Sequence, residues 1–161
     1  MDQIDILVET VSQAAPGAVF RLLRDGSTWP GWSVFDRFEL EREGDDDRLG
    51  VGAIRVFITR VSRAREEVVE IIPDRRLSYV LLSGLPFEDY RADVDLVPDP
   101  AGHTTIRWRA RFRARHPVLG GFWRWFMIQT LRNVSRQLAR AAENPTIVAS
   151  ADRPAPTEGS S

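Results

Sequence analysis

Polar and apolar residues alternate without a break in the segment TTIRWRARFR, residues 104–113. A period of two over these ten residues predicts a β-strand with one face against a core and the other in water. The predicted inward set is Thr104, Ile106, Trp108, Ala110 and Phe112. Because an antiparallel sheet can leave one face in water, a helix has to cover only the other face.

Six other segments have the composition or alternation of strands: residues 3–11, 34–42, 50–59, 65–72, 77–82 and 90–97. Two of them leave side-chain directions open. REEVVEII (65–72) does not alternate cleanly, so Arg65 and Glu67 are either surface charges, which we favour, or a buried ion pair. LSYVLL (77–82) does not fix the face of Tyr79, whereas Tyr90 is predicted to face inward.

Helices are predicted on either side of this run of strands. Two short helical segments follow the first strand: an apolar-faced helix around residues 16–24, and the compact aromatic turn WPGW (29–32). A long amphipathic helix spans about residues 119–143, with an apolar face of Met127, Leu131, Val134, Leu138 and Ala141. Its start, FWRWFMI (122–128), is interpreted as buried core, with a movable entrance jointed at Gly120–Gly121 or a membrane or partner surface as alternatives.

Composition limits the function classes. The chain has 161 residues, 43% hydrophobic and 28% charged, which predicts one soluble domain over residues 1–144 and a disordered polar tail over 145–161. A net charge of -1 gives no overall bias toward nucleic acid. The absence of lysine excludes Schiff-base chemistry, and the absence of cysteine excludes disulfides and fits a cytoplasmic location. Neither a signal peptide nor an apolar run long enough for stable membrane insertion is seen.

Charged and metal-ligating residues give little sign of chemistry. The arginines at alternate positions from Arg107 to Arg115 are interpreted as an outer face neutralised by neighbouring strands, with a phosphate or nucleic-acid surface as the alternative. The acids expected beside them are Asp5, Glu9, Asp93 and Asp95. His103 and His116 lack catalytic or metal-binding partners at a useful spacing, so neither a metal nor a cofactor is expected.

The element order and several segments resemble the START/Bet v1-like superfamily, and within it the bacterial polyketide cyclase/dehydrase-like proteins. The resemblance covers about residues 3–143 and depends on AAPGAVFRLLRDGSTWPGW, GVGAIR, EEVVEIIPDRRLSYVLLSGLPFEDYRADVDL and the closing helix. It implies an α+β helix-grip fold, in which a curved seven-stranded antiparallel sheet wraps around the long C-terminal helix and encloses an apolar cavity.

The function expected from this resemblance is binding of a hydrophobic, lipid-like or polyketide-like molecule, without a cofactor and without nucleic acid, by a monomer or homodimer. The residues expected to line the cavity are Phe38, Ile54, Val56, Tyr79, Tyr90, Ala92, Val94, Trp108, Ala110, Met127 and Leu131. A cyclase or dehydratase is the enzymatic alternative, with Arg65, Glu67 and Tyr79 as weak catalytic candidates. A non-catalytic interaction module, with a cavity filled by side chains, is the third possible function.

Overall fold

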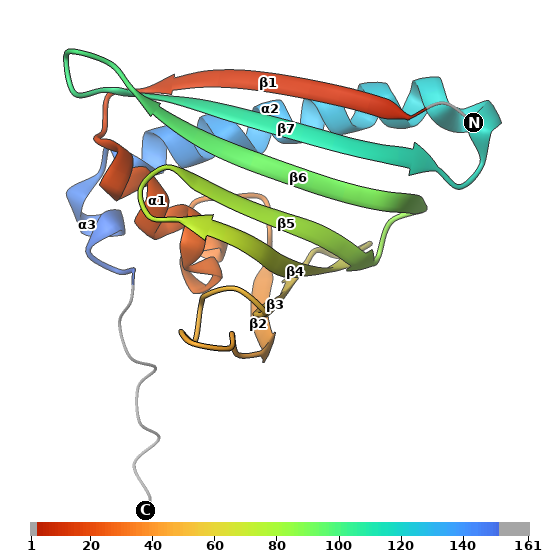
Figure 1. The fold of residues 1–161 in the computed structure, drawn as a ribbon, viewed down its shortest axis with the longest axis horizontal. Helices are drawn as coiled ribbons and strands as arrows, with labels where there is room; N and C mark the ends of the chain where they lie inside the picture. The colour runs from red at the N-terminus through yellow and green to blue at the C-terminus, as the bar shows by residue number, and fades with distance from the viewer. Residues whose placement is uncertain (1–2, 152–161) are drawn as a thin grey trace, which may run out of the picture.

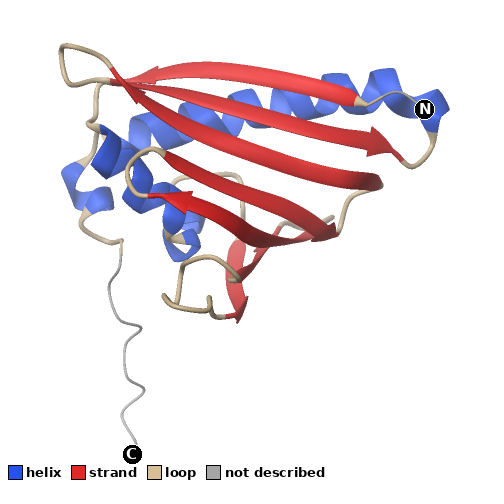
Figure 2. Ribbon diagram, viewed as in Figure 1, coloured by secondary structure: helices blue, strands red, loops and turns tan. Residues whose placement is uncertain are grey.

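The strands of the computed structural model, which describes residues 3–151, form one antiparallel sheet in the order β1-β7-β6-β5-β4-β3-β2. Their bounds are β1 (Ile4–Ser12), β2 (Arg37–Arg42), β3 (Ile54–Ile58), β4 (Arg63–Ile72), β5 (Arg76–Ser83), β6 (Phe87–Pro98) and β7 (Thr104–Ala114). Figure 2 shows these strands as one curved layer with the helices behind it. The predicted seven-stranded sheet is confirmed.

The helices lie where the sequence predicts them. α1 (Pro16–Arg24) and the 3-10 turn η1 (Gly26–Gly31) follow β1, and a second 3-10 turn, η2 (Pro117–Leu119), leads into α2 (Gly120–Ala142). α2 runs along the concave side of the sheet, behind β1 and β7 (Figure 1). This is the predicted helix-grip fold.

β7 shows why the sheet has one dry face. Its inward set is buried throughout, and the ring of Trp108 is 1% exposed. β7 pairs with β1 on one side and β6 on the other, as predicted. Strands with one apolar face therefore meet in a single core beneath α2.

The charges on the outer face pair differently from the prediction. Arg107 does contact Glu9, with Nε 3.1 Å from Oε1. The two β6 acids named in the prediction, however, pair with arginines outside β7: Asp95 lies 2.7 Å from Nε of Arg76, and Asp93 accepts from Arg91. Asp89, at the start of β6, does pair with Arg113 of β7. The face is a network of mixed charges, but β7 supplies fewer of its cations than expected.

A bulge in β4 explains why REEVVEII does not alternate. Val68 lies opposite Tyr79 and Glu70 lies opposite Ser78, so Val69 is an extra residue on the β4 side of the pair. Val68 is buried before the bulge, and Ile71 packs against the core after it. The inward positions therefore change parity within the strand.

The disordered tail is predicted to begin at residue 145, but the chain is ordered beyond that point. Residues 145–148 form a short helix, α3 (Pro145–Val148), in which the Asn144 side chain accepts hydrogen bonds from the backbone N–H groups of Thr146 and Ile147. Ile147 and Val148 pack against the core, and Ala151 is 3% exposed. The prediction of disorder is wrong for residues 145–151, and the rest of that tail lies outside the described residues.

Candidate functional site

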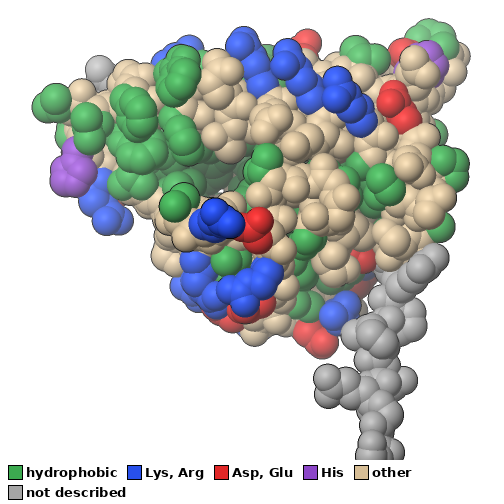
Figure 3. Space-filling model, turned by 180° about the vertical axis from the view of Figure 1, so that it is seen from behind, with side chains coloured by type: hydrophobic (Ala, Val, Ile, Leu, Met, Phe, Trp, Pro, Cys, Tyr) green, Lys and Arg blue, Asp and Glu red, His purple; other side chains and the backbone are tan. Residues whose placement is uncertain are grey.

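A cavity of about 260 Å³ lies between the concave face of the sheet and the middle of α2. It opens on the side of the molecule away from the view of Figure 1, where hydrophobic side chains surround a hollow (Figure 3). The lining residues come from the η1 region, β3 to β7 and α2: Trp29, Val34, Phe35, Phe57, Thr59, Val61, Ser62, Ala64, Glu66, Tyr79, Leu81, Leu85, Tyr90, Trp108, Phe126, Met127, Thr130, Leu131 and Val134.

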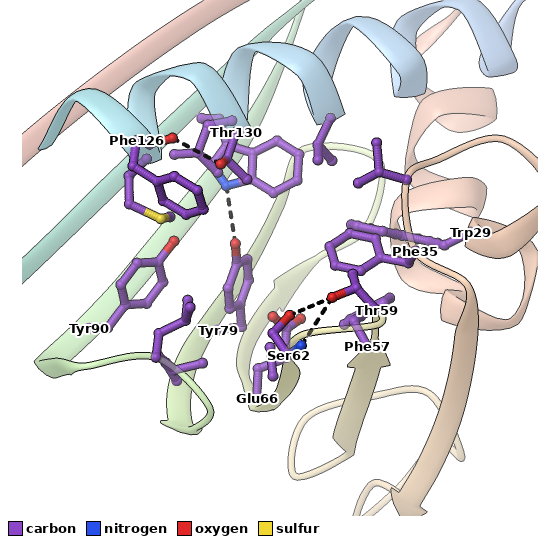
Figure 4. A pocket seen from close by; sticks show the side chains of 18 of the residues that line it. Trp29, Phe35, Phe57, Thr59, Ser62, Glu66, Tyr79, Tyr90, Phe126 and Thr130 are labelled. Atoms are coloured by element: carbon purple, nitrogen blue, oxygen red, sulfur yellow. Dashed lines mark hydrogen bonds between the residues drawn. The ribbon is translucent and has the colours of Figure 1, made fainter. Parts of the chain in front are cut away.

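An aromatic cluster fixes one end of the cavity. Trp29 donates its Nε1–H to the backbone oxygen of Leu22, 2.9 Å away, which holds the indole against the end of α1. The same ring packs on Phe57, with ring centroids 4.5 Å apart, and on Phe35. Side chains from η1, the following loop and β3 therefore form one rigid wall (Figure 4).

A buried ion pair lies in the sheet beside this cluster. Arg55 on β3 donates from Nε to Oε1 of Glu66 on β4 at 3.0 Å, and its Nη2 donates to the same oxygen. A further donor of Arg55 contacts the backbone oxygen of Leu23 at 2.9 Å. The guanidinium also lies 5.2 Å from the Phe57 ring centroid. Burial raises the pKa of Glu66, and the Arg55 guanidinium opposes that rise.

Two tyrosines extend the polar groups along the sheet wall. The indole Nε1–H of Trp108 donates to the hydroxyl oxygen of Tyr79 at 3.2 Å. Tyr90 lies next to Tyr79, with ring centroids 6.2 Å apart. Burial raises the pKa of both tyrosines, so both hydroxyl groups carry their protons at neutral pH. The phenolic oxygens point toward the space beneath α2 (Figure 4).

The rim of the cavity is apolar and exposed. Val61, in the turn between β3 and β4, is 95% exposed, and Phe126 on α2 is 37% exposed. The neighbouring α2 side chains Phe122 and Trp125 are 52% and 60% exposed. The interpretation of FWRWFMI as buried core is therefore wrong for these three aromatic residues, because this end of α2 extends beyond the sheet edge that would cover it.

Five of the eleven residues predicted from the sequence are in the cavity wall: Tyr79, Tyr90, Trp108, Met127 and Leu131. Three others, Ala92, Val94 and Ala110, face the core but lie outside the cavity, since they are fully buried where the space beneath the helix is filled. Phe38 also lies outside it, packed on Phe57 with ring centroids 5.3 Å apart.

Ile54 and Val56 correct the predicted face of β3. Arg55 and Phe57 point to the concave side, so their neighbours Ile54 and Val56 point outward. Both are nevertheless buried, because ion pairs between β2 and β4 extend over this part of β3. These pairs are Arg63–Glu39, Arg65–Glu41 and Arg42–Glu67.

The weak catalytic candidates are split between the two faces. Arg65 and Glu67 belong to the outer ion pairs, as favoured from the sequence, and neither lines the cavity. Tyr79 does line it. Sequence reasoning missed Arg55 and Glu66. An arginine inside the apolar run AIRVFI was the available signal, since a buried arginine needs a buried acid nearby.

Metal and membrane signatures are missing from the part of the chain that the structure describes. Within residues 3–151, no group of three or more His, Cys, Asp or Glu side chains is placed to hold a metal ion. No helix in the same range is long and apolar enough to cross a bilayer. The polar side chains in the cavity wall carry carboxyl, phenol and hydroxyl groups, from Glu66, the two tyrosines, Thr59, Ser62 and Thr130.

Comparisons with known proteins agree with this architecture. A family model described as polyketide cyclase / dehydrase and lipid transport matches residues 3–143. No curated protein matches the sequence.

Solved structures match much of the chain at low sequence identity. A START superfamily protein from Mycobacterium smegmatis has a TM-score of 0.72 at 15% identity, covering 88% of this chain and 97% of that one. The major latex-like protein 151 of Panax ginseng gives 0.69 at 15%, covering 88% and 99%. A Thalictrum norcoclaurine synthase mutant, solved with a transition-state analogue, gives 0.70 at 12%, covering 88% and 95%. These similarities show a shared fold.

Proposed function

The chain belongs to the polyketide cyclase/dehydrase and lipid transport family, and from this membership we propose that it binds a hydrophobic small molecule in the cavity between the sheet and α2. The observation that carries the proposal is a half-open apolar cavity with a few polar groups in its wall. Such an arrangement is typical of ligand sites, in which apolar area supplies affinity and a few polar groups set orientation.

The size of the cavity favours a compact ligand. Its 260 Å³ is close to the lower limit of ligand pockets, which measure about 300–1,000 Å³. A two- or three-ring polyketide-like molecule suits this volume better than a long two-chain lipid. The open space also argues against the alternative of an interaction module whose cavity is filled by side chains.

A neutral fluorescent probe, N-phenyl-1-naphthylamine, tests the proposal. We expect saturable binding with one site per chain and an increase in probe fluorescence, because the cavity wall is mostly apolar. Thr130→Trp places an indole in the cavity and is expected to weaken binding at least tenfold. Gln129→Trp, at the adjacent exposed position on α2, is the matched control and should bind as the wild type does.

The exposed aromatic residues at the start of α2 offer the probe a competing site. If Thr130→Trp binds the probe as tightly as the wild type, the probe occupies that outer surface and not the cavity. That result would contradict the proposed function. Mass spectrometry of the purified protein, with bound small molecules released gently or under denaturing conditions, then identifies a natural ligand where one is retained.

Catalysis is a second candidate, favoured by the position of Glu66 in the cavity wall. A buried carboxylate beside tyrosine hydroxyl groups has the composition of a general-base site. A bound aryl 1,3-diketone would then exchange its acidic C–H for deuterium faster than the free compound does. Loss of that acceleration in Glu66→Gln, with probe binding retained, favours the enzyme, and no acceleration in the wild type favours a binding protein.

A further inference from the structure

Glu66 has one carboxylate oxygen that accepts no hydrogen bond from the described residues. Both hydrogen bonds from Arg55 are accepted by Oε1, and no hydrogen bond within residues 3–151 involves Oε2. The side chain is only 9% exposed, yet it belongs to the cavity wall. Buried carboxylates normally use both oxygens as acceptors, so Oε2 is the acceptor available to a molecule in the cavity.

Arg55, by contrast, is closed off from a ligand. Its side chain is 1% exposed and is not part of the cavity wall. Three aromatic rings surround the guanidinium, with centroids at 5.2 Å for Phe57 and 5.8 Å for Trp29 and Tyr79. An anionic ligand entering the cavity therefore meets the Glu66 carboxylate first, with the compensating cation behind it. Like-charge contact disfavours carboxylate ligands at this position.

The opposite wall completes the pattern. α2 contributes the apolar side chains of Met127, Leu131 and Val134 to the cavity wall. The helix runs across the cavity from Tyr79, Tyr90 and Glu66 (Figure 4). A ligand that fills this space has an apolar face toward the helix and a polar edge toward the sheet. Flat ring systems with a substituent at the edge have that shape and fit the cavity volume.

We propose that the cavity selects neutral, compact aromatic molecules carrying a hydroxyl group, and that Oε2 of Glu66 accepts the hydrogen bond from that hydroxyl. This inference rests on the proposed function, because it names the ligand class of the same cavity. Tyr79 and Tyr90 then contact the polar edge further along the sheet, while α2 contacts the apolar face.

Three matched compounds separate the alternatives: 2-naphthol has a donor, 2-methoxynaphthalene has none, and 2-naphthoate is an anion. Their affinities for the wild type at pH 7.5 are measured by isothermal titration calorimetry. We expect 2-naphthol to bind at least about tenfold more tightly than either of the others, since a hydrogen bond to a charged acceptor supplies that difference.

Glu66→Gln tests the residue itself. Its amide oxygen has to face Arg55, so its NH2 group faces the cavity and the acceptor is lost. The preference for 2-naphthol over 2-methoxynaphthalene should fall to less than about threefold, because the oxygen of either compound can accept a hydrogen bond from that NH2 group. Glu67→Gln, on the outer face of the same strand, is the control and should keep the wild-type preference.

The outcomes are distinct. If 2-naphthol and 2-methoxynaphthalene bind the wild type equally, or 2-naphthoate binds most tightly, this inference is wrong and the proposed function stands. If none of the three compounds and no N-phenyl-1-naphthylamine binds, the proposed function fails and this inference fails with it. The wild-type series decides the question even where Glu66→Gln does not fold.

Discussion

Arg55 and Glu66 lie on adjacent strands, and both hydrogen bonds between them converge on one oxygen of the acid. Only the acid reaches the cavity wall, and the arginine stays behind it. Burying a charge costs free energy, so removing one member of this buried pair leaves the other charge uncompensated. The pair thus connects the stability of the sheet to the chemistry of the cavity.

Removing one member of this pair should destabilise the protein more than removing both. Glu66→Met leaves a buried guanidinium that cannot lose its charge, and we expect a loss of about 3–5 kcal/mol in the free energy of unfolding. The double variant Arg55→Met/Glu66→Met leaves no buried charge and should recover most of that loss. Urea unfolding followed by tryptophan fluorescence measures both.

A matched control comes from the outer face of the sheet. Arg65→Met breaks the exposed pair with Glu41 and should cost less than about 1 kcal/mol. If the double variant is less stable than Glu66→Met, the pair contributes net stability and the argument from desolvation is wrong.

The raised pKa of Glu66 gives a pH dependence of known sign. In the unfolded chain this carboxyl titrates near 4.5, while burial raises its pKa in the folded protein. Its favourable contribution is complete below pH 4.5 and is lost as pH rises through the folded pKa. The difference in Tm between the wild type and Glu66→Gln should therefore decrease from pH 4.5 to pH 8.

Subtracting the Tm of Glu66→Gln from that of the wild type at each pH removes the contribution of acids that titrate in the same way in both proteins. Asp93 is one of these: burial would raise its pKa, but hydrogen bonds from Ser78 and Arg91 lower it below its ordinary value. Its contribution is present at neutral pH and is lost under acid conditions in both proteins. A Tm difference that increases with pH would show that Arg55 outweighs burial at Glu66.

The fold was predictable because the sheet and helix signals are strong and independent. β7 alternates over its full length, and α2 repeats its apolar positions at helical spacing. The order of the elements then resembles one known superfamily. Local patterns of this kind specify which elements form and which face of each is dry, with little help from distant contacts.

The cavity was less predictable, since its shape depends on three-dimensional packing. The sequence IRVFI of β3 does not alternate clearly, and all five of its residues are buried in the structure. An arginine in this run signals a buried charge but does not show which face of the sheet Arg55 occupies. The bulge at Val69 similarly hides the inward position of Glu66. Ala92 and Tyr90 share a face of β6, but only the tyrosine reaches open space.

The hydrogen bond between Trp108 and Tyr79 should stabilise the sheet wall. Tyr79→Phe removes the acceptor and leaves the buried indole N–H without a partner, which costs about 1–3 kcal/mol. Trp108→Phe removes the donor, so a double-mutant cycle isolates the pair. We expect a coupling energy of at least about 0.5 kcal/mol from urea unfolding, and a value of zero would contradict the hydrogen bond.

Phe126 should control how fast a ligand leaves the cavity. Its ring lies at the rim, partly exposed, and packs edge-on against Trp123 with ring centroids 5.6 Å apart. Phe126→Ala removes the largest α2 side chain at the opening, so the path outward widens while most of the cavity wall remains. We expect the dissociation rate of N-phenyl-1-naphthylamine to rise at least threefold in stopped-flow displacement. Trp125→Ala removes a more exposed aromatic residue outside the wall and should leave the rate unchanged, and equal rates in both variants would place the exit elsewhere along the rim.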